Sequence, residues 1–514
     1  MVNHMSEWSS GYNVDIGYTY GYQRELSPTW LDYVATLHSL SAPTGEWRYL
    51  ELGCGQGLSI LLTAALHPTH EFLGIDFNPQ HIAHAQSLAA AAGLTNVRFE
   101  EADFFDLADN WASEWGKFNY ITAHGIYTWI SEAGQSALRG TIEKASSPGA
   151  LIYLSYNTMP GWISTVPVQH LMRLWQKSTN AQSVPAINSG LERIKALRDS
   201  GAFMFKALPD ITSRINKMEK ENSTYLVHEY LHDHWTPLWF DQLANDLQSV
   251  KMSYVGTARI GDFYCEDILP PKQKEQLAQT KDSTVREVML DVLANQSFRK
   301  DVFSRGAVPL QAVSRSRELQ QTTFNLLKTP DDTEIKFKIS IGDVLGKREV
   351  YRPLIDALED GPKSLAQLTS ISSPTECTFD GTLQAMTMLL HGGMVGLHYV
   401  PPDNNPAKAL NKAICKAASE GSPYRHLVSP QTGSVIPCNE VDMIMLTKVT
   451  EDQRLPSPDQ LAETLLDCLV TLNKTLMKEG KHLTEDHAMR SQALSLATVF
   501  LDESLPKFRL QGVV

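Results

Sequence analysis

Paired cysteines, long apolar runs and a secretion signal are all missing from this sequence. None of the six cysteines in the 514 residues stands in a CxxC pair. This spacing excludes a zinc knuckle and a regular disulfide framework, and it indicates a reducing compartment. The most apolar stretch, residues 386–397, is interrupted by Gly392 and Gly393 and is too short for a bilayer, which needs about 20 residues. Because residues 1–21 also lack the apolar core of a signal peptide, we expect a cytoplasmic protein without a membrane-inserted segment.

An excess of positive charge is missing as well. The formal net charge is −13, which argues against nucleic acid as the main partner because phosphate binding needs clustered Lys and Arg. Hydrophobic residues make up 42% of the chain, an ordinary share for a globular protein. The chain is longer than one hydrophobic core usually supports, so we expect several domains.

Short β-rich runs alternate with helical stretches between Trp47 and Asn157. The predicted strands are Arg48–Leu52, Glu71–Ile75, Val97–Glu101, Asn119–Ala123 and Ala150–Ser155. Between them lie the predicted helices Leu58–Leu66 and His81–Ala92, the second followed by Gly93 as a helix C-terminus prefers. This alternation predicts the α/β class, with a Rossmann-like, doubly wound parallel sheet.

The pattern changes after Pro160 and predicts four parts. These are a catalytic domain at 1–165, a helical insertion at 166–222, a mixed segment at 223–306 and a mainly α C-terminal region at 307–514. Near 350–400 the expected order is helix, turn, helix, helix and short hairpin, which is the order of a winged-helix module. Dimerisation through the helical insertion is a further hypothesis.

A glycine-rich turn between the first strand and helix carries the strongest site signal. Gly53, Gly55 and Gly57 let the backbone turn sharply and approach a ligand closely, and the next helix presents its free N–H groups there. The spacing differs from the GxGxxG of NAD sites. Glu51, two residues before the first glycine, suits a ligand with an ammonium group, so S-adenosylmethionine is favoured over NAD.

Further candidates follow the later strands, where such a sheet binds its ligand. Asp76, followed by Phe77, closes the second strand and can accept from ribose hydroxyls. Asp103 and Phe104 follow the third strand and suit the amino group and face of adenine. His124 and Gly125 follow the fourth strand and are expected under the sulfonium end of the cofactor.

These residues resemble the motifs of class I S-adenosylmethionine methyltransferases over about Arg48 to Tyr156. The segments 18–22, 124–130, 155–162, 228–231 and 295–306 more narrowly resemble bacterial methyltransferases that carry a methyltransferase regulatory domain, a family that includes rickettsial protein lysine methyltransferases. The resemblance implies that 223–306 is the regulatory domain. It also implies that Glu51 and the three glycines cradle the methionine part, Asp76 the ribose, and Asp103 with Phe104 the adenine, while Tyr20 and Tyr22 close over the cofactor.

The sequence says less about the methyl acceptor than about the cofactor. A lysine acceptor must lose its proton, which a desolvated aromatic pocket favours. Candidate pocket rings in the loops after strands four and five are Tyr127, Trp129, Tyr156 and Trp162, with simple core packing as the alternative. An oxygen acceptor calls for a base, for which His124 or Glu229 could serve. A protein lysine is therefore one hypothesis, and a small-molecule or saccharide acceptor is the alternative.

His228, Glu229 and His232 match the HExxH signature of zinc hydrolases, and His234 lies close by. No third ligand stands at the expected spacing, so this remains a remote alternative. A regulator that only senses the cofactor is another alternative, against which the intact Glu51, Asp76 and Asp103 argue.

Overall fold

The computed structural model describes residues 20–179, 181–208, 210–329, 335–371, 378–452, 454–478 and 480–514. The expectations for residues 1–19, including Tyr18 and Thr19 of the N-terminal motif, and for Cys377 lie outside the described residues. No helix within the described ranges is long and apolar enough to cross a membrane.

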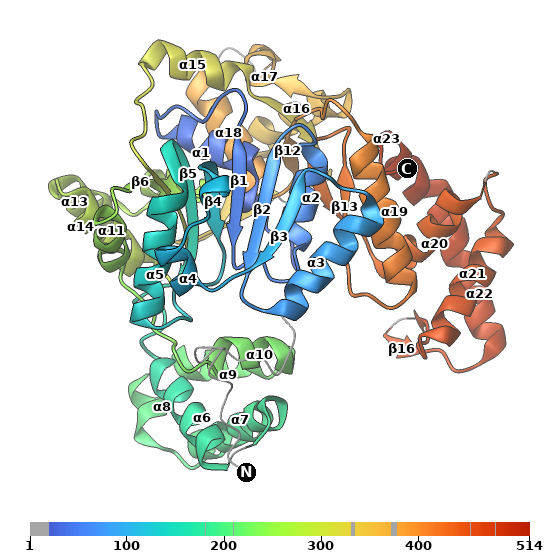
Figure 1. Ribbon diagram of the computed structural model, residues 1–514, viewed down its shortest axis with the longest axis horizontal. Coiled ribbons are helices and arrows are strands. Elements are labelled where there is room, and N and C mark those ends of the chain that lie inside the picture. The colour runs from blue at the N-terminus through green and yellow to red at the C-terminus, as the bar shows by residue number, and fades with distance from the viewer. Residues whose placement is uncertain are drawn as a thin grey trace.

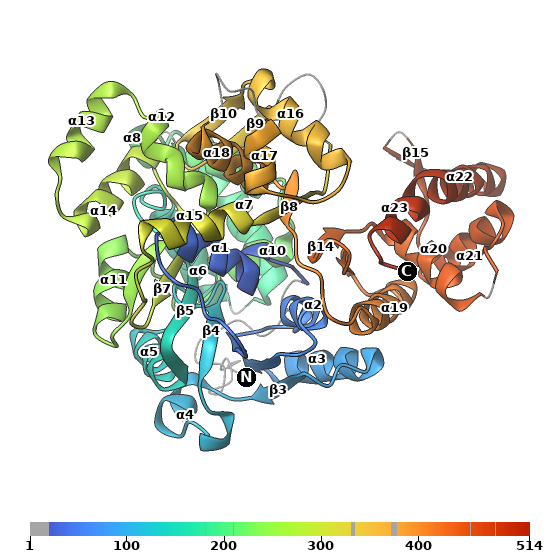
Figure 2. The same cartoon turned by 90° about the horizontal axis from the view of Figure 1, so that it is seen from above.

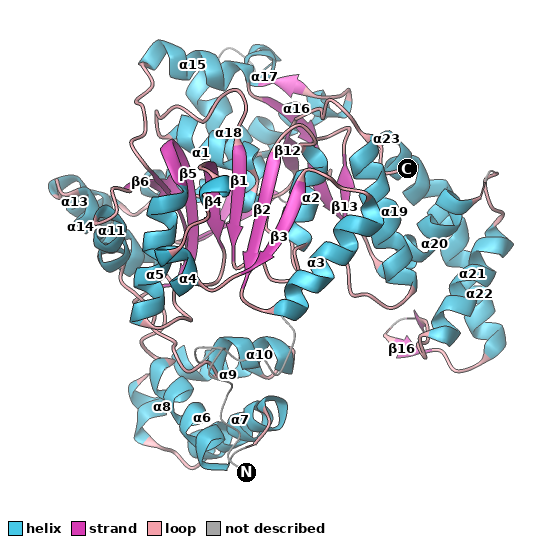
Figure 3. Ribbon diagram, viewed as in Figure 1, coloured by secondary structure: helices cyan, strands magenta, loops and turns pink. Residues whose placement is uncertain are grey.

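A seven-stranded sheet forms the centre of the N-terminal half (Figures 1 and 3). Its order is β3-β2-β1-β4-β5-β7-β6; the first five strands are parallel, and β7 runs antiparallel to both neighbours. The strands are β1 (Arg48–Leu52), β2 (Glu71–Asp76), β3 (Val97–Glu101), β4 (Phe118–Ala123), β5 (Ser146–Asn157), β6 (Ser253–Thr257) and β7 (Phe298–Ser304). The five predicted strands and the predicted Rossmann-like fold are thus confirmed.

Helices cover both faces of the sheet because its strands alternate apolar side chains between the two sides. Tyr49 of β1 belongs to the core shared with α1 (Pro28–Leu37), α2 (Leu58–Leu66) and α3 (Pro79–Ala92). Its neighbour Leu50 belongs to the core shared with α4 (Phe104–Asp109), α5 (Glu132–Ala145) and α11 (Phe240–Gln248). As expected, Gly93 ends α3 in the left-handed conformation.

A helical cap with a core of its own lies below the sheet in Figure 1; it extends beyond the predicted insertion at 166–222, because its last helix begins at Ser223. Its helices are α6 (Val166–Thr179), α7 (Ser183–Asp199), α8 (Phe203–Ala207), α9 (Asp210–Met218) and α10 (Ser223–Tyr230). The chain then returns through α11, β6, the 3-10 helix η4 (Ile260–Tyr264), α12 (Cys265–Ile268), α13 (Pro271–Gln279), α14 (Ser283–Ala294) and β7. The catalytic domain predicted at 1–165 therefore contains only five of the seven strands, because β6 and β7 come from later in the chain.

The first part of the C-terminal region packs beside α1 (Figure 2). It comprises α15 (Ala312–Gln321), β8 (Thr323–Leu326), β9 (Ile335–Ile339), β10 (Gly342–Gly346), α16 (Arg348–Glu359), β11 (Lys363–Ser364), α17 (Leu365–Ile371), α18 (Phe379–His391) and β12 (Val395–Leu397). The expected terminal hairpin is not formed in the described residues, because β12 pairs with the earlier strand β8. The winged-helix prediction is not confirmed.

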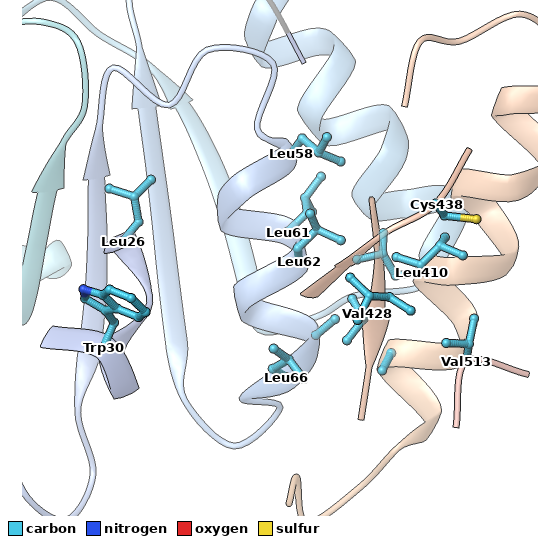
Figure 4. Close-up of a cluster of buried hydrophobic side chains, with 14 of the residues drawn as sticks. Leu26, Trp30, Leu58, Leu61, Leu62, Leu66, Leu410, Val428, Cys438 and Val513 are labelled. Carbon is cyan, nitrogen blue, oxygen red and sulfur yellow. The ribbon is translucent and has the colours of Figure 1, made fainter. Parts of the chain in front are cut away.

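The last part of the chain packs against α2 and α3 through α19 (Asn405–Ser419) (Figures 2 and 4). The other elements here are β13 (His426–Ser429), β14 (Ser434–Pro437), α20 (Glu440–Glu451), α21 (Pro458–Thr471), β15 (Met477–Lys478), β16 (Lys481–His482), α22 (Asp486–Val499) and α23 (Leu505–Leu510). All nine residues of α2 are buried, so this helix is enclosed by the sheet on one side and the C-terminal region on the other.

Truncating Leu410 at this contact is expected to destabilise the protein. Leu410→Ala removes a fully buried side chain of α19 that lies opposite α2 (Figure 4). The free energy of unfolding should fall by about 2–5 kcal/mol because the variant loses apolar burial and leaves a cavity. Chemical denaturation would measure this change. The matched control is Leu510→Ala, which truncates a largely exposed leucine and should have little effect; equal losses in both variants would contradict the prediction.

Candidate functional site

The glycine-rich turn between β1 and α2 has the backbone conformation that requires glycine. Gly53, Gly55 and Gly57 have φ of 69°, 53° and 77°. A Cβ on Gly53 would lie 2.5 Å from the Ile126 side chain, so the turn and the loop after β4 are in direct contact. The N–H groups of Gly53 and Cys54 donate to the carbonyl of Ile75, which fixes the turn to the end of β2.

Asp76 holds the turn from the neighbouring strand. Its Oδ2 accepts from the Gly55 N–H at 2.8 Å, and its Oδ1 accepts from the Asn78 N–H at 2.9 Å and contacts His81 Nδ1 at 3.2 Å. An ionised carboxylate offers about four acceptor sites, so capacity remains for a ligand hydroxyl. Asp76 therefore organises the turn and is also available to a ribose.

Glu51 is a buried carboxylate whose Oε2 has no hydrogen-bond partner among the described residues. Burial, with the charge of Asp76 as a smaller cause, raises the pKa of Glu51 from its ordinary 4.5 to about 8. A buried acceptor left without a donor is costly, and a ligand ammonium group would satisfy it. The residues present thus fit a cofactor that carries an amino acid end.

The raised pKa of Glu51 predicts a pH effect on the ligand-free protein. The folded state keeps this proton at neutral pH, whereas the unfolded chain releases it above its ordinary pKa. Stability should therefore fall as pH rises from about 5 to about 8, and Glu51→Gln should remove that part of the fall. Melting temperatures of both proteins across this range would measure it. Parallel curves for wild type and variant would contradict the prediction.

One cavity at the ends of β1 to β4 brings together most of the predicted cofactor residues. The predicted residues that line it are Gly53, Gly55, Asp76, Phe77, Asp103, Phe104, His124 and Gly125. Asp103 also caps α4 by accepting from the Phe105 N–H at 2.8 Å. His81 lines the same cavity but was not among the predicted residues; its only sequence signal is its position in the first turn of the helix after Asp76.

The N-terminal tyrosines do not line this cavity. The ring of Tyr20 packs edge-on against His84 and Tyr424, and Tyr22 packs against His426. His84 lies 2.8 Å from the carbonyl of Gln56 through Nδ1 and 2.7 Å from the Tyr424 hydroxyl through Nε2. Tyr20 thus joins a cluster that links the glycine-rich turn to the C-terminal region. Gly57 is the N-cap residue of α2, and both Gly57 and Glu51 lie outside the cavity lining.

A second cavity, of about 450 Å³, adjoins the first and is called the acceptor cavity below. The two share His124, Gly125 and Trp129, so they meet beneath the end of β4. Its aromatic lining consists of Trp129, Trp162, Tyr225, Tyr230 and Phe298. The lining includes buried residues of the sheet edge and exposed residues of the cap, so the cavity runs from the interior to the surface.

Two polar groups in the acceptor cavity have perturbed pKa values. Glu229 is buried, accepts a hydrogen bond from the Asn157 amide at 3.0 Å, and has its pKa raised by burial. His124 lies 2.9 Å from the Tyr153 hydroxyl and 3.0 Å from that of Ser155. Burial, aided by the Lys300 charge, lowers the pKa of His124 to about 4, so this imidazole is neutral at pH 7.

Tyr127 and Tyr156 lie outside both cavities. The Tyr127 hydroxyl donates to Asp246 at 2.9 Å, and that of Tyr156 donates to Asp301 at 2.6 Å. Both rings are fully buried, so the structure places them in the core, whereas Trp129 and Trp162 face the acceptor cavity.

The HExxH segment does not have the geometry of a zinc site. The rings of His228 and His232 lie 5.9 Å apart, but α10 ends at Tyr230, before His232, so the segment is not the continuous helix of an HExxH site. The described residues contain no group of three or more His, Cys, Asp or Glu side chains that could hold a metal. His228, Glu229 and His232 instead line the acceptor cavity.

Comparisons with known families and relatives agree with this site. Residues 44–258 match a family described as a methyltransferase domain, and residues 222–305 match one described as a predicted methyltransferase regulatory domain. An uncharacterised protein of Synechocystis sp. is 30% identical over 98% of this chain and 99% of its own length. An uncharacterised protein of Rickettsia prowazekii is 27% identical over 59% of this chain and 53% of its own length.

The fold is also that of a solved structure. PKMT2 from Rickettsia typhi, in complex with AdoHcy, has a TM-score of 0.71 at 18% identity, covering 96% of this chain and 99% of that protein. The matching methyltransferase family and the residues of the first cavity identify S-adenosylmethionine as the cofactor. The chain therefore belongs to the S-adenosylmethionine-dependent methyltransferases that carry a methyltransferase regulatory domain.

Proposed function

We propose that this methyltransferase acts on the side-chain amine of a protein lysine. The observation that carries the proposal is the Glu229–Asn157 pair, a buried carboxylate and amide in an aromatic cavity that meets the cofactor cavity at His124, Gly125 and Trp129. A carboxylate at this place would attract an ammonium group and receive its proton.

The shape of the acceptor cavity supports a long side chain on a larger molecule. Lys217, Glu221 and Tyr225 are exposed at the cap, whereas Asn157 and Glu229 are buried in the interior. Lysine carries its amine on a four-carbon apolar stem, which aromatic walls would cover. The similarity in fold to PKMT2 from Rickettsia typhi is consistent with this acceptor.

The residues of this cavity would prepare the amine for transfer. When bound, S-adenosylmethionine supplies an activated methyl group for in-line displacement. Trp129, Trp162 and Phe298 exclude water, which disfavours the charged ammonium and orients its stem. The Glu229 carboxylate accepts the proton that leaves the amine; its raised pKa makes it a better base than an exposed carboxylate. Asn157 holds Glu229 in place through its amide.

The test uses the full chain and S-adenosylmethionine labelled in its methyl group. It compares lysine-rich polypeptide substrates with the same sequences carrying arginine, and amino acid analysis after hydrolysis identifies the labelled residue. Label recovered as methyl-lysine supports the proposal. Label found only in a low-mass fraction of cell extract, or on a saccharide hydroxyl, would instead favour the small-molecule alternative.

A further inference from the structure

A third cavity, of about 200 Å³, lies apart from the cofactor and acceptor cavities. It is bordered by α14, by residues 257–266 after β6, and by the turn between β9 and β10. We call it the α14 cavity. No residue that lines it lines either of the other two, and most of its walls come from the segment that matches the regulatory family.

Negative charge exceeds positive charge around Arg299, a buried residue of the α14 cavity. Its guanidinium donates to Asp301 at 2.7 Å, Asp291 at 2.8 Å and Glu287 at 2.8 Å, so one cation faces three carboxylates. The other two carboxylates of the lining have separate partners: Asp262 pairs with Arg259, and Glu266 pairs with Arg286. The excess of negative charge therefore lies on the three carboxylates that contact Arg299.

One oxygen of this group has no protein partner. Asp291 is 2% exposed, and its Oδ2 has no hydrogen-bond donor among the described residues, although its Oδ1 binds Arg299. Burial, only partly offset by Arg299, raises the pKa of Asp291 to about 7. Asp291 lines the α14 cavity, and a buried carboxylate oxygen without a donor would be stabilised by a cation bound beside it.

The surroundings favour an organic cation over a metal ion. Ca²⁺ and Mg²⁺ take about six or more oxygen ligands, whereas the other carboxylates here are engaged by arginines. An ammonium group needs only one or two acceptors, and its carbon body can rest on apolar walls, which Phe263, Leu290 and Ile341 supply. We propose that the α14 cavity binds a small organic ammonium ion, with Asp291 as its anionic partner.

Two consecutive residues, Gln296 and Ser297, connect the wall of the α14 cavity to the wall of the acceptor cavity. Gln296 lines the α14 cavity and donates to the Ser340 hydroxyl at 2.8 Å, while its carbonyl accepts from the Gly161 N–H at 2.8 Å. The carbonyl of Ser297 accepts from the Trp162 indole at 2.6 Å, and both Ser297 and Trp162 line the acceptor cavity.

The test measures binding of butane-1,4-diamine to the full chain by calorimetry at about pH 8, where Asp291 is ionised. Butan-1-ol and MgCl₂ serve as the neutral and metallic probes. Asp291→Asn removes the anionic partner, Ala294→Phe fills the cavity, and Glu275→Gln makes the same carboxylate-to-amide change at an exposed position of α13. S-adenosylmethionine binding, measured in every variant, reports whether the variant is folded.

The expected result is saturable one-site binding of the diamine that weakens at least about tenfold in Asp291→Asn and Ala294→Phe and is unchanged in Glu275→Gln. If Asp291→Asn does not bind S-adenosylmethionine, that variant is not folded, and the loss of diamine binding in Ala294→Phe then tests the proposal. Absence of diamine binding, equal binding in Ala294→Phe, or equal binding of butan-1-ol would overturn the proposal. Saturable Mg²⁺ binding that excludes the diamine would overturn the choice of an organic ion.

Discussion

Replacing Asp76 with alanine is expected to weaken S-adenosylmethionine binding by about a hundredfold or more. The variant loses an anionic acceptor for the ribose and also frees the N–H groups of Gly55 and Asn78, which Asp76 holds at 2.8 and 2.9 Å. Hydrogen bonds to a charged group contribute about 1.5–3 kcal/mol each, so losing those that the ribose hydroxyls would donate to Asp76 gives an effect of this size. Calorimetric titration with S-adenosylmethionine is the measurement.

The control for this variant is Asp109→Ala, which removes a carboxylate from an exposed position at the end of α4. Its affinity should equal that of the wild type. Unchanged affinity in Asp76→Ala would show that the cavity at the ends of β1 to β4 does not hold the cofactor in the way we describe.

Replacing Glu229 with glutamine is expected to lower kcat by about a hundredfold or more and to leave the affinity for S-adenosylmethionine unchanged. Glutamine keeps the size of the side chain but cannot accept the proton of the acceptor, and Glu229 does not line the cofactor cavity. The defect should shrink as pH rises, because the amine then loses its proton to solvent. A pH profile of methyl transfer, together with calorimetry, measures both effects.

Glu219→Gln is the matched control, since Glu219 is exposed next to the cap and lines neither cavity. A uniform loss of activity at every pH in Glu229→Gln would indicate a structural role instead of proton transfer. Full activity in this variant would remove Glu229 from the proposed function.

The cofactor cavity could be predicted from the sequence because its signals are local. Gly53, Gly55 and Gly57 need positive φ, and a carboxylate at the end of a parallel strand lies at the ligand-binding edge whatever surrounds it. Five strands and the glycine-ended helix α3 follow from periodicity within short windows. Each of these features depends on residues that are close to it in the sequence.

The acceptor cavity depends on contacts between distant segments, which no local pattern encodes. Asn157 and Glu229 meet only because the cap returns α10 to the end of β5. Side-chain alternation offered one usable signal: Tyr156 and Asn157 are neighbours on β5, so they face opposite sides of the sheet. A prediction that Asn157 faces the cavity would therefore also have predicted that Tyr156 faces the core. The end of α10 at Tyr230, before His232, had no clear sequence signal.

The enclosure of α2 has a consequence for how the protein is made. Residues 58–66 leave the ribosome early, but the α19 surface that covers them is synthesised far later. At about 5–20 residues per second, the roughly 340 residues between Leu66 and Leu410 take on the order of tens of seconds. During that interval an apolar helix has no native cover on one side. Nascent chains should therefore depend on chaperones, and chains that stop before α19 should aggregate instead of accumulating as a stable catalytic fragment.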